Sequence, residues 1–264
     1  MSDVDMKPDF PKLLCPFERK TFKVDVQDFR KHGCKLGMRA PEVLLAMPYP
    51  NEDRDMMWIF EDDSYAVEKL HGTNLCVEIK DNRLVHIQNR KNLIDFTRVL
   101  GTKEGLPLTA RMLEGVLHAG ERKYLKNNIV EYGELIGPSL NQNIHLLNRH
   151  LWVPFRTAQE KLRYNSFEKY PKNYWGWSEW FRTSLKSMLY CRMNKLSLSA
   201  MFTNPDVPFT EGIVIYHKNE PWMCKLRRDM FFWYYCDKVH IYDLPEEFLA
   251  HAKEAGFKVK GYTD

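Results

Sequence analysis

The sequence has little net charge of either sign. Its 264 residues include 39 Lys and Arg against 35 Asp and Glu, which gives a formal charge of +4. So small a surplus does not by itself indicate a polyanionic partner, and any nucleic-acid site must therefore be local. Long apolar runs are also missing: the longest, residues 230–236, falls far short of the roughly 20 residues needed to cross a bilayer. Since the first residues also lack a secretion-signal layout, we expect a soluble protein that is cytoplasmic or otherwise intracellular, with no membrane partner.

Paired metal-ligand cysteines and linker sequences are absent as well. The six cysteines include no Cys-x-x-Cys pair, and no histidines stand at zinc-ligand spacing, so reduced thiols are the simplest interpretation. There is no internal repeat and no run of Gly, Ser and Pro. Because 44% of the residues are hydrophobic and 13% aromatic, the chain can bury a large core, which excludes a disordered or low-complexity protein.

Short β-rich runs separated by turn residues dominate the sequence from Tyr65 onward, which predicts antiparallel strands. The predicted strands cover 65–70, 75–79, 84–88, 129–135, 151–155, 212–216 and 222–227. Helices are predicted over 110–118 and 246–255, together with one that is capped by Ser178 and carries Phe181, Leu185, Met188 and Leu189. The fold class is therefore α+β. We predict an N-terminal extension over 1–64, broken by prolines, and a domain over 65–264 with a Trp-rich insertion at about 157–200.

Lys69 is the leading nucleophile candidate. It ends a predicted strand just before Gly72, where the missing Cβ lets a phosphate approach closely. An amine attacks only when it is neutral, and nearby cations favour that form. Lys225 and Arg227 are the candidate cations, because residues two apart on a strand face the same way. Glu134 and Glu211 are candidates for holding a hydrated divalent metal or a ribose hydroxyl, since Mg²⁺ prefers hard oxygen ligands.

Four segments, taken together with two shorter ones, resemble the ordered motifs of the ATP-dependent RNA ligases, a family of covalent nucleotidyltransferases. Residues 68–74, Glu-Lys-Leu-His-Gly-Thr-Asn, resemble motif I of phage double-strand RNA ligases and RNA-editing ligases. The later segments follow in the family's order: Asn89-Arg-Lys91 (Ia), Tyr132-Gly-Glu-Leu-Ile-Gly-Pro138 (III), Leu151-Trp-Val-Pro-Phe155 (IIIa), Glu211-Gly-Ile-Val214 (IV) and Lys225-Leu-Arg227 (V). The resemblance covers about residues 65–230.

The resemblance implies a nucleotidyltransferase (ATP-grasp-like) fold of antiparallel sheets flanked by helices. It also implies an RNA ligase that uses ATP and Mg²⁺ or Mn²⁺ to join 5′-phosphate and 3′-hydroxyl RNA ends through a lysyl-AMP intermediate and an RNA-adenylate. Lys69 would carry the AMP, and the remaining implied ligands are residues of the same motifs. The implied nucleotide contacts are Glu68 (adenine edge), His71, Gly72, Asn74, Arg90, Glu134, Trp152, Phe155, Glu211, Lys225 and Arg227, with Glu134 and Glu211 at the metal.

Two features depart from the family pattern. Motif V usually has two lysines, whereas Arg227 stands at the second place; the charge is retained, but a planar guanidinium replaces a point charge. The segment after Arg227 is too short for a full C-terminal OB-type domain of the kind found in relatives. We therefore expect RNA to be held by the catalytic domain, by the N-terminal segment, by the Trp-rich insertion or by a protein partner.

Two alternatives remain open at the level of sequence. A capping-type RNA guanylyltransferase would use the same lysine with GTP. A catalytically silent nucleic-acid-binding relative would have kept the fold alone, although decay should then have removed at least one of Lys69, Glu134, Glu211 or Lys225, and all four are present.

Overall fold

The structure of the chain is a computed structural model that describes residues 6–32, 41–51, 56–90, 93–94 and 106–263. The chain divides into two compact units, each made of three separate stretches. Unit 1 comprises residues 1–12, 66–164 and 185–211, and unit 2 comprises residues 13–65, 165–184 and 212–264. The second stretch of unit 1 begins at residue 66, one residue after the start of the domain predicted over 65–264. The predicted insertion at about 157–200 contributes residues to both units.

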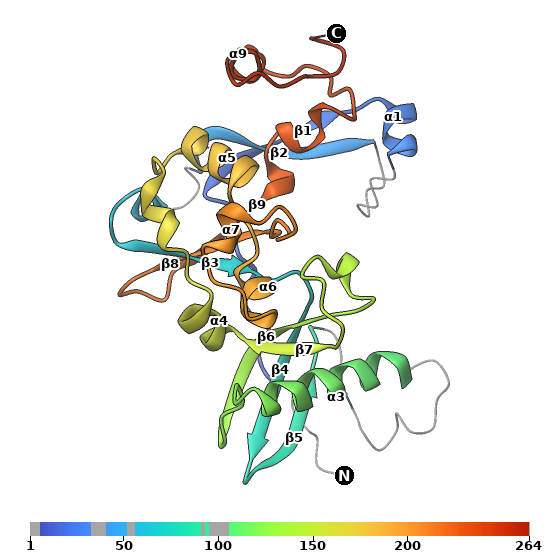
Figure 1. Cartoon of the computed structure of the whole chain (residues 1–264), viewed down its shortest axis with the longest axis vertical. Coiled ribbons are helices and arrows are strands. Elements are labelled where there is room, and N and C mark those ends of the chain that lie inside the picture. Colours follow the sequence, from blue (N-terminus) through green and yellow to red (C-terminus); the bar gives the residue numbers. More distant parts are fainter. Residues whose placement is uncertain (1–5, 33–40, 52–55, 91–92, 95–105, 264) are drawn as a thin grey trace. The chain divides into compact units, whose positions relative to one another are not determined.

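Unit 1 contains a four-stranded antiparallel sheet with the order β5-β4-β6-β7 (Figure 1). These strands are β4 (Thr73–Lys80), β5 (Arg83–Gln88), β6 (Ile129–Ile136) and β7 (Leu151–Pro154), all of them predicted from the sequence. The register places Asn74 opposite Glu134 and Leu135 opposite Trp152. Residues paired in this way share a face of the sheet, so the Asn74 and Glu134 side chains are neighbours.

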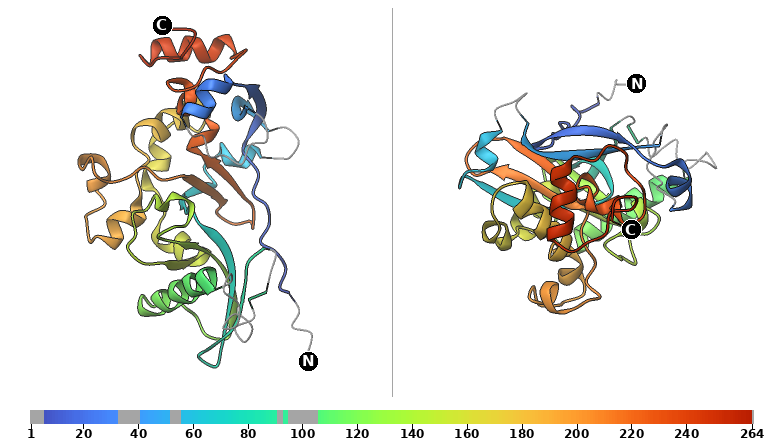
Figure 2. Two further views of the ribbon diagram at one scale, coloured as in Figure 1. Left: turned by 90° about the vertical axis from the view of Figure 1, so that its right-hand side faces the viewer. Right: turned by 90° about the horizontal axis from the view of Figure 1, so that it is seen from above.

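Helix α3 (Leu106–Glu121) lies along this sheet and is longer than the predicted helix over 110–118 (Figure 2). Its stripe of Met112, Val116 and Ala119 is buried, as expected for an amphipathic helix packed on a sheet. The other elements of unit 1 are short. They are η2 (Asn141–Asn143), α4 (Phe155–Lys161), α6 (Met188–Met193) and α7 (Ala200–Thr203).

Unit 2 contains two strand pairs. Strands β1 (Phe17–Lys23) and β2 (Glu42–Pro50), which the sequence analysis does not predict, pair antiparallel with Thr21 opposite Leu44. Strands β8 (Gly212–His217) and β9 (Met223–Arg227), both predicted from the sequence, form the second pair, with Val214 opposite Lys225. Strand β3 (Ser64–Lys69) starts in this unit, where the Tyr65 ring stacks on Tyr216 of β8.

A cluster of aromatic rings forms the core of unit 2. Tyr174 of helix α5 (Tyr174–Thr183) contacts Phe17 at 5.3 Å and Phe231 at 5.2 Å between ring centroids, and Phe232 stacks on Phe248 at 4.6 Å. The remaining elements of the unit are α1 (Val26–Lys31), η1 (Met57–Ile59), η3 (Asn165–Lys169), η4 (Arg228–Met230), α8 (Trp233–Cys236) and α9 (Glu246–Glu254). Helix α9 confirms the helix predicted over 246–255.

The helix predicted to begin at Ser178 is wrong. Asn173 caps α5 instead, because its side chain accepts a hydrogen bond from the Gly176 N–H, and the helix ends at Thr183. Ser178 lies inside this helix, where its hydroxyl accepts from the indole N–H of Trp233 at 2.8 Å. Met188 and Leu189 belong to the separate helix α6, whose N-cap is Ser187.

The α+β class with antiparallel sheets flanked by helices is confirmed. Among the residues that the structure describes, no helix combines the length and apolar character needed to cross a bilayer.

Candidate active site

Lys69 occupies the end of strand β3 inside unit 1 and forms a close ion pair. Its Nζ lies 2.6 Å from Oε2 of Glu211 and also donates to the carbonyl of Leu70 at 3.2 Å. The two charged side chains are only 19% and 13% exposed, so the pair is largely withdrawn from water. The sequence hypothesis places cations beside this amine. Within unit 1, its ion-pair partner is instead a carboxylate.

Glu134 of β6 supplies a second carboxyl group at the same place. Its Oε1 accepts a hydrogen bond from the backbone N–H of Gly72 at 3.0 Å. Burial raises the pKa of Glu134 to about 7; the charge of Lys69 works against this rise and the charge of Glu211 adds to it. Near neutral pH the Glu134 carboxyl group is therefore present in both the protonated and the ionised form. A bound cation would favour the ionised form.

The carboxyl groups of Glu134 and Glu211 fit the binding of a hydrated divalent cation. Among the described residues, no group of three or more His, Cys, Asp or Glu side chains is arranged to hold a metal ion. Mg²⁺ is typically held by one or two carboxylates together with substrate phosphates and water. Glu134 and Glu211 supply that number of hard oxygen ligands.

The turn after Lys69 depends on a glycine. A Cβ placed on Gly72 would lie 1.9 Å from the backbone oxygen of Leu135 in β6, a distance that no side chain allows. The side-chain amide of Asn141 donates a hydrogen bond to the carbonyl of Gly72. The close packing of this turn on β6 brings the Gly72 N–H to Glu134, which explains why a glycine follows the candidate nucleophile.

Glu68 is a buried carboxylate that is hydrogen-bonded to protein groups of unit 1. The residue is 2% exposed, and its carboxylate accepts hydrogen bonds from the Ser187 hydroxyl at 2.6 Å and the Leu189 N–H at 2.8 Å. His145 Nδ1 lies 3.4 Å from the same carboxylate. Both oxygens thus accept hydrogen bonds from protein groups of unit 1, and the contact with an adenine edge that the resemblance implies stays a prediction.

His145 and Ser187, which the sequence analysis does not single out, connect this carboxylate to the turn. The His71 backbone N–H donates to His145 Nε2 at 3.3 Å. His145 Nδ1 lies 3.3 Å from the Ser187 hydroxyl oxygen and 3.4 Å from Oε1 of Glu68. No sequence pattern marks these two residues, because each stands far along the chain from motif I.

The two expected aromatic contacts for the base also differ in position. Trp152 is 1% exposed on strand β7, and its indole N–H has no hydrogen-bond partner among the described residues; its expected contact with the base stays a prediction. Phe155 begins helix α4 and packs against Phe10 with ring centroids 4.6 Å apart. Of the two rings, only Phe155 is partly exposed.

Arg90 lies at the surface of unit 1. Its Nε is 3.7 Å from Oδ1 of Asp9, and both side chains are about half exposed. The charge of Arg90 acts weakly against the rise in the pKa of Glu134. Lys91, from the same predicted motif, lies outside the described residues.

Lys225 and Arg227 belong to unit 2, on strand β9. The alternation of the strand buries Cys224 and Leu226 and leaves Lys225 and Arg227 partly exposed on the other face, which confirms that they face the same way. Arg227 Nε pairs with Asp229 at 3.0 Å. Burial raises the pKa of the nearby Cys15 thiol to about 11, while a backbone hydrogen bond from Phe17 and the charges of Arg19, Arg227 and Lys225 act to lower it.

Solved structures similar to this chain are RNA ligases of Naegleria gruberi. A mutant without ligand aligns with a TM-score of 0.36 and 14% identity, and a mutant of the ligase R4a without ligand with 0.32 and 15%. A third mutant, solved with ATP and Mn, aligns with 0.35 and 14%. Each match covers 64% of this chain and 50% of the other, so the chain spans about half the length of these ligases. No protein-family model matches the sequence, and no curated protein matches it.

Proposed function

We propose that this chain is an ATP-dependent RNA ligase that joins a 5′-phosphate to a 3′-hydroxyl through lysyl-AMP and RNA-adenylate. The observation that carries the proposal is the partly buried Lys69–Glu211 pair at 2.6 Å, with Glu134 interacting electrostatically with both. It is supported by the ordered resemblance of the motif segments to the RNA ligases.

In the first step, the Lys69 amine attacks the α-phosphorus of ATP. Glu211 Oε2 lies within hydrogen-bond distance of Nζ, so it is placed to accept the proton that the ammonium must lose before attack. A bond forms between Nζ and the α-phosphorus, the bond from that phosphorus to the bridging oxygen breaks, and pyrophosphate leaves. Lys225 and Arg227 are proposed to bear the charge that grows on the α-phosphate.

Two further transfers complete the reaction. The 5′-phosphate of an RNA attacks the phosphorus of lysyl-AMP, and the bond to Nζ breaks to give RNA-adenylate. The 3′-hydroxyl of the other RNA end then attacks the 5′-phosphorus, and AMP leaves as the phosphodiester forms. Asn74, His71, Arg90 and Phe155 are the proposed contacts of the nucleotide, while Glu68 is proposed to support the strand that carries Lys69.

Glu134 and Glu211 are the residues that would hold Mg²⁺ or Mn²⁺, which would neutralise phosphate charge when bound. Their carboxyl groups lie beside the amine, where the triphosphate would have to sit. We further propose that the protein acts inside the cell, where ATP and RNA are available, and that a protein partner assists in holding the RNA.

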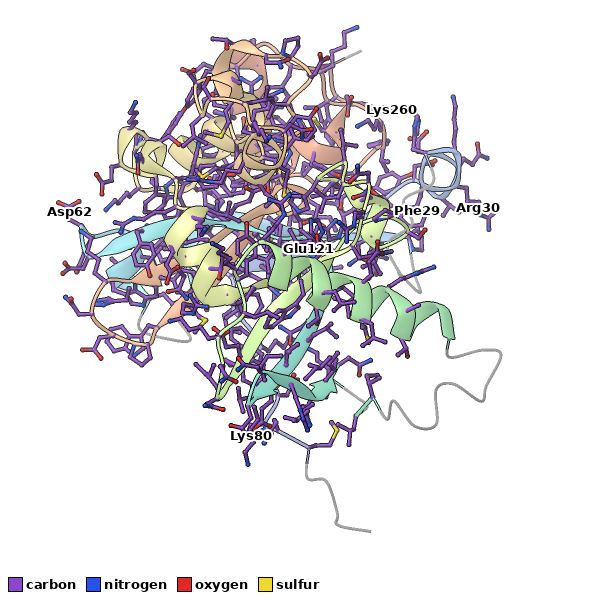
Figure 3. All side chains as sticks on the ribbon, turned by 60° about the horizontal axis from the view of Figure 1, so that its bottom comes forward. Phe29, Arg30, Asp62, Lys80, Glu121 and Lys260 are labelled. Atoms are coloured by element: carbon purple, nitrogen blue, oxygen red, sulfur yellow. The ribbon has the colours of Figure 1, made fainter. Side chains whose placement is uncertain are left out.

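The test is a mass measurement of the purified protein after incubation with ATP and Mg²⁺. The parent protein should gain the mass of one AMP, and Lys69→Ala should gain none and seal no RNA. Lys80→Ala is the matched control, because this exposed lysine ends β4 in the same unit and its side chain extends from the strand (Figure 3).

Parallel incubations separate the alternatives. A mass gain with GTP and not with ATP would support the capping-type guanylyltransferase instead. RNA binding without any nucleotide adduct in the parent protein would support the silent binding module. An adduct that persists in Lys69→Ala would overturn the proposed nucleophile.

A further inference from the structure

His145 of unit 1 lies against the chain on both sides of Lys69. Its side chain is 1% exposed, and it belongs to none of the segments that resemble the ligase motifs. Nε2 of the ring accepts a hydrogen bond from the His71 backbone N–H at 3.3 Å, and Nδ1 lies 3.4 Å from Oε1 of Glu68. Glu68 directly precedes Lys69, and His71 follows two residues after it. One imidazole ring therefore contacts the residues that flank the candidate nucleophile.

The Ser187 hydroxyl joins this ring to the Glu68 carboxylate. The hydroxyl oxygen lies 3.3 Å from Nδ1 of His145, and the hydroxyl donates to Oε1 of Glu68 at 2.6 Å. Ser187 is also the N-cap of helix α6, where its oxygen accepts from the Tyr190 N–H at 3.1 Å. The Leu189 N–H of that helix donates to Oε2 of Glu68 at 2.8 Å. Glu68, His145 and Ser187 are at most 2% exposed, and a buried polar network whose members are hydrogen-bonded is rigid.

The network reaches Lys69 through the main chain. Because adjacent side chains of a strand point to opposite faces, the Lys69 side chain leaves the network and meets Glu211 instead, with Nζ 2.6 Å from Oε2. The carbonyl of Lys69 accepts from the Thr210 hydroxyl at 3.3 Å, and Thr210 directly precedes Glu211. The position of Nζ therefore depends on how firmly the main chain of residues 68–71 is held. A displacement of about 1 Å can slow a reaction up to about a hundredfold.

We propose that His145 is a positioning residue that holds Lys69 in place for attack on the α-phosphorus of ATP, through its hydrogen bond with the His71 N–H. This role rests on the proposed function. The ring is buried and both of its nitrogens lie against protein groups, so His145 itself contacts neither ATP nor RNA. Its loss should therefore slow the formation of lysyl-AMP, with little effect on the binding of ATP.

The experiment compares His145→Gln with His145→Asn in the single-turnover formation of lysyl-AMP, followed by protein mass at several ATP concentrations. Each amide keeps a hydrogen-bond acceptor. The longer Gln side chain can place it where Nε2 accepts from the His71 N–H, whereas that of Asn reaches only the place of Nδ1. His145→Asn should lower the limiting rate about tenfold or more, and His145→Gln should retain most of it. The ATP concentration that gives half of the limiting rate should change by less than about twofold in both.

His118→Asn is the matched control. His118 is another buried histidine of unit 1 with both ring nitrogens hydrogen-bonded, Nδ1 to the His150 carbonyl at 3.0 Å and Nε2 to the Arg122 side chain at 3.1 Å. Its melting temperature should fall as in His145→Asn, because each variant loses a buried hydrogen bond. Its limiting rate should equal that of the parent protein, since the described hydrogen bonds of His118 include no residue of the turn after Lys69.

Ser187→Ala tests the same network without changing the ring, and it decides the question if the variants of His145 do not fold. It should lower the limiting rate at an unchanged half-saturating ATP concentration, and a rate equal to that of the parent would overturn the proposal. Equal rates in His145→Gln and His145→Asn, a change in the half-saturating ATP concentration alone, or an equal loss of rate in His118→Asn would also overturn it. A parent protein that gains no AMP overturns the proposed function and this inference with it, whereas a parent that gains AMP no faster than His145→Asn overturns this inference alone.

Discussion

At the scale of single residues, the neighbours Glu68 and Lys69 have opposite surroundings. Alternation along a strand sends adjacent side chains to opposite faces, so only one of the two can lie beside Glu211. Lys69 does so, and Glu68 is turned into the interior, where a serine hydroxyl and a backbone N–H saturate its carboxylate. A buried charge is tolerated only when it is hydrogen-bonded in this way.

We predict that Glu68→Gln destabilises the protein by about 2 kcal/mol. The amide keeps the size of the side chain but turns an NH₂ group toward the Ser187 hydroxyl or the Leu189 N–H, so one buried donor is left unsatisfied. Thermal unfolding followed by calorimetry would measure the loss. Glu61→Gln is the control, since Glu61 is exposed and its described hydrogen bonds are made by its backbone N–H and carbonyl groups. Equal melting temperatures for the two variants would contradict the buried role of Glu68.

At the scale of elements, the strand–turn–strand unit β3–β4 is held by its glycine. Strand β4 runs beside β6 from Thr73 to Ile79, and the turn that precedes it must approach the backbone of β6 to enter this register. The missing side chain of Gly72 makes that approach feasible. The same contact carries the Gly72 N–H to Glu134, so the geometry of the sheet and that of the candidate site are set together.

Gly72→Ala and Gly120→Ala should therefore act in opposite directions. At position 72 the new methyl group meets the backbone of Leu135, and we expect a loss of about 2 kcal/mol or more together with loss of the AMP adduct. At position 120, near the end of α3, it makes an ordinary 3.4 Å contact with Leu125 and should add up to about 1 kcal/mol by favouring the helix. Melting temperatures and adduct mass measure both effects. A Gly72→Ala variant that melts and labels like the parent would contradict the tight turn.

At the scale of the whole molecule, each unit is made of three stretches that are distant in sequence. Asp28 of α1 shows how such stretches are joined within unit 2: its carboxylate accepts from the His240 N–H at 3.1 Å and pairs with Lys260. Contacts across more than two hundred residues make the stability of this unit depend on its last stretch of chain. A contiguous fragment cannot contain either unit without residues of the other.

Asp28 also gives the stability a predictable pH dependence. The hydrogen bonds from Lys260 and the His240 N–H lower the pKa of Asp28 below its ordinary value of 3.8. The stabilisation is therefore complete above about pH 4 and is lost as the pH falls through the lowered value. Asp28→Asn should cost about 1 kcal/mol at pH 7 and progressively less below pH 4, measured by thermal melts at pH 7 and pH 3. Asp206→Asn, at an exposed position, is the control. A deficit that stays constant with pH would contradict this assignment.

The sequence by itself determined the features that depend on neighbours along the chain. Alternating apolar residues and turn residues gave the strands β3 to β9, the α+β class followed from them, and the order of short motifs indicated Lys69, Glu134 and Glu211 as a group. Strands β1 and β2 escaped prediction because prolines interrupt their segment, although edge positions tolerate prolines.

Only the tertiary structure decided which side chains are buried and which distant residues they contact. It buried Glu68 against Ser187 and His145, took Trp152 into the core and replaced Ser178 by Asn173 as a helix cap. Each of these outcomes depends on contacts between residues far apart along the chain. Local propensity and periodicity contain no information about such contacts, because burial and pairing are settled only when distant segments pack together.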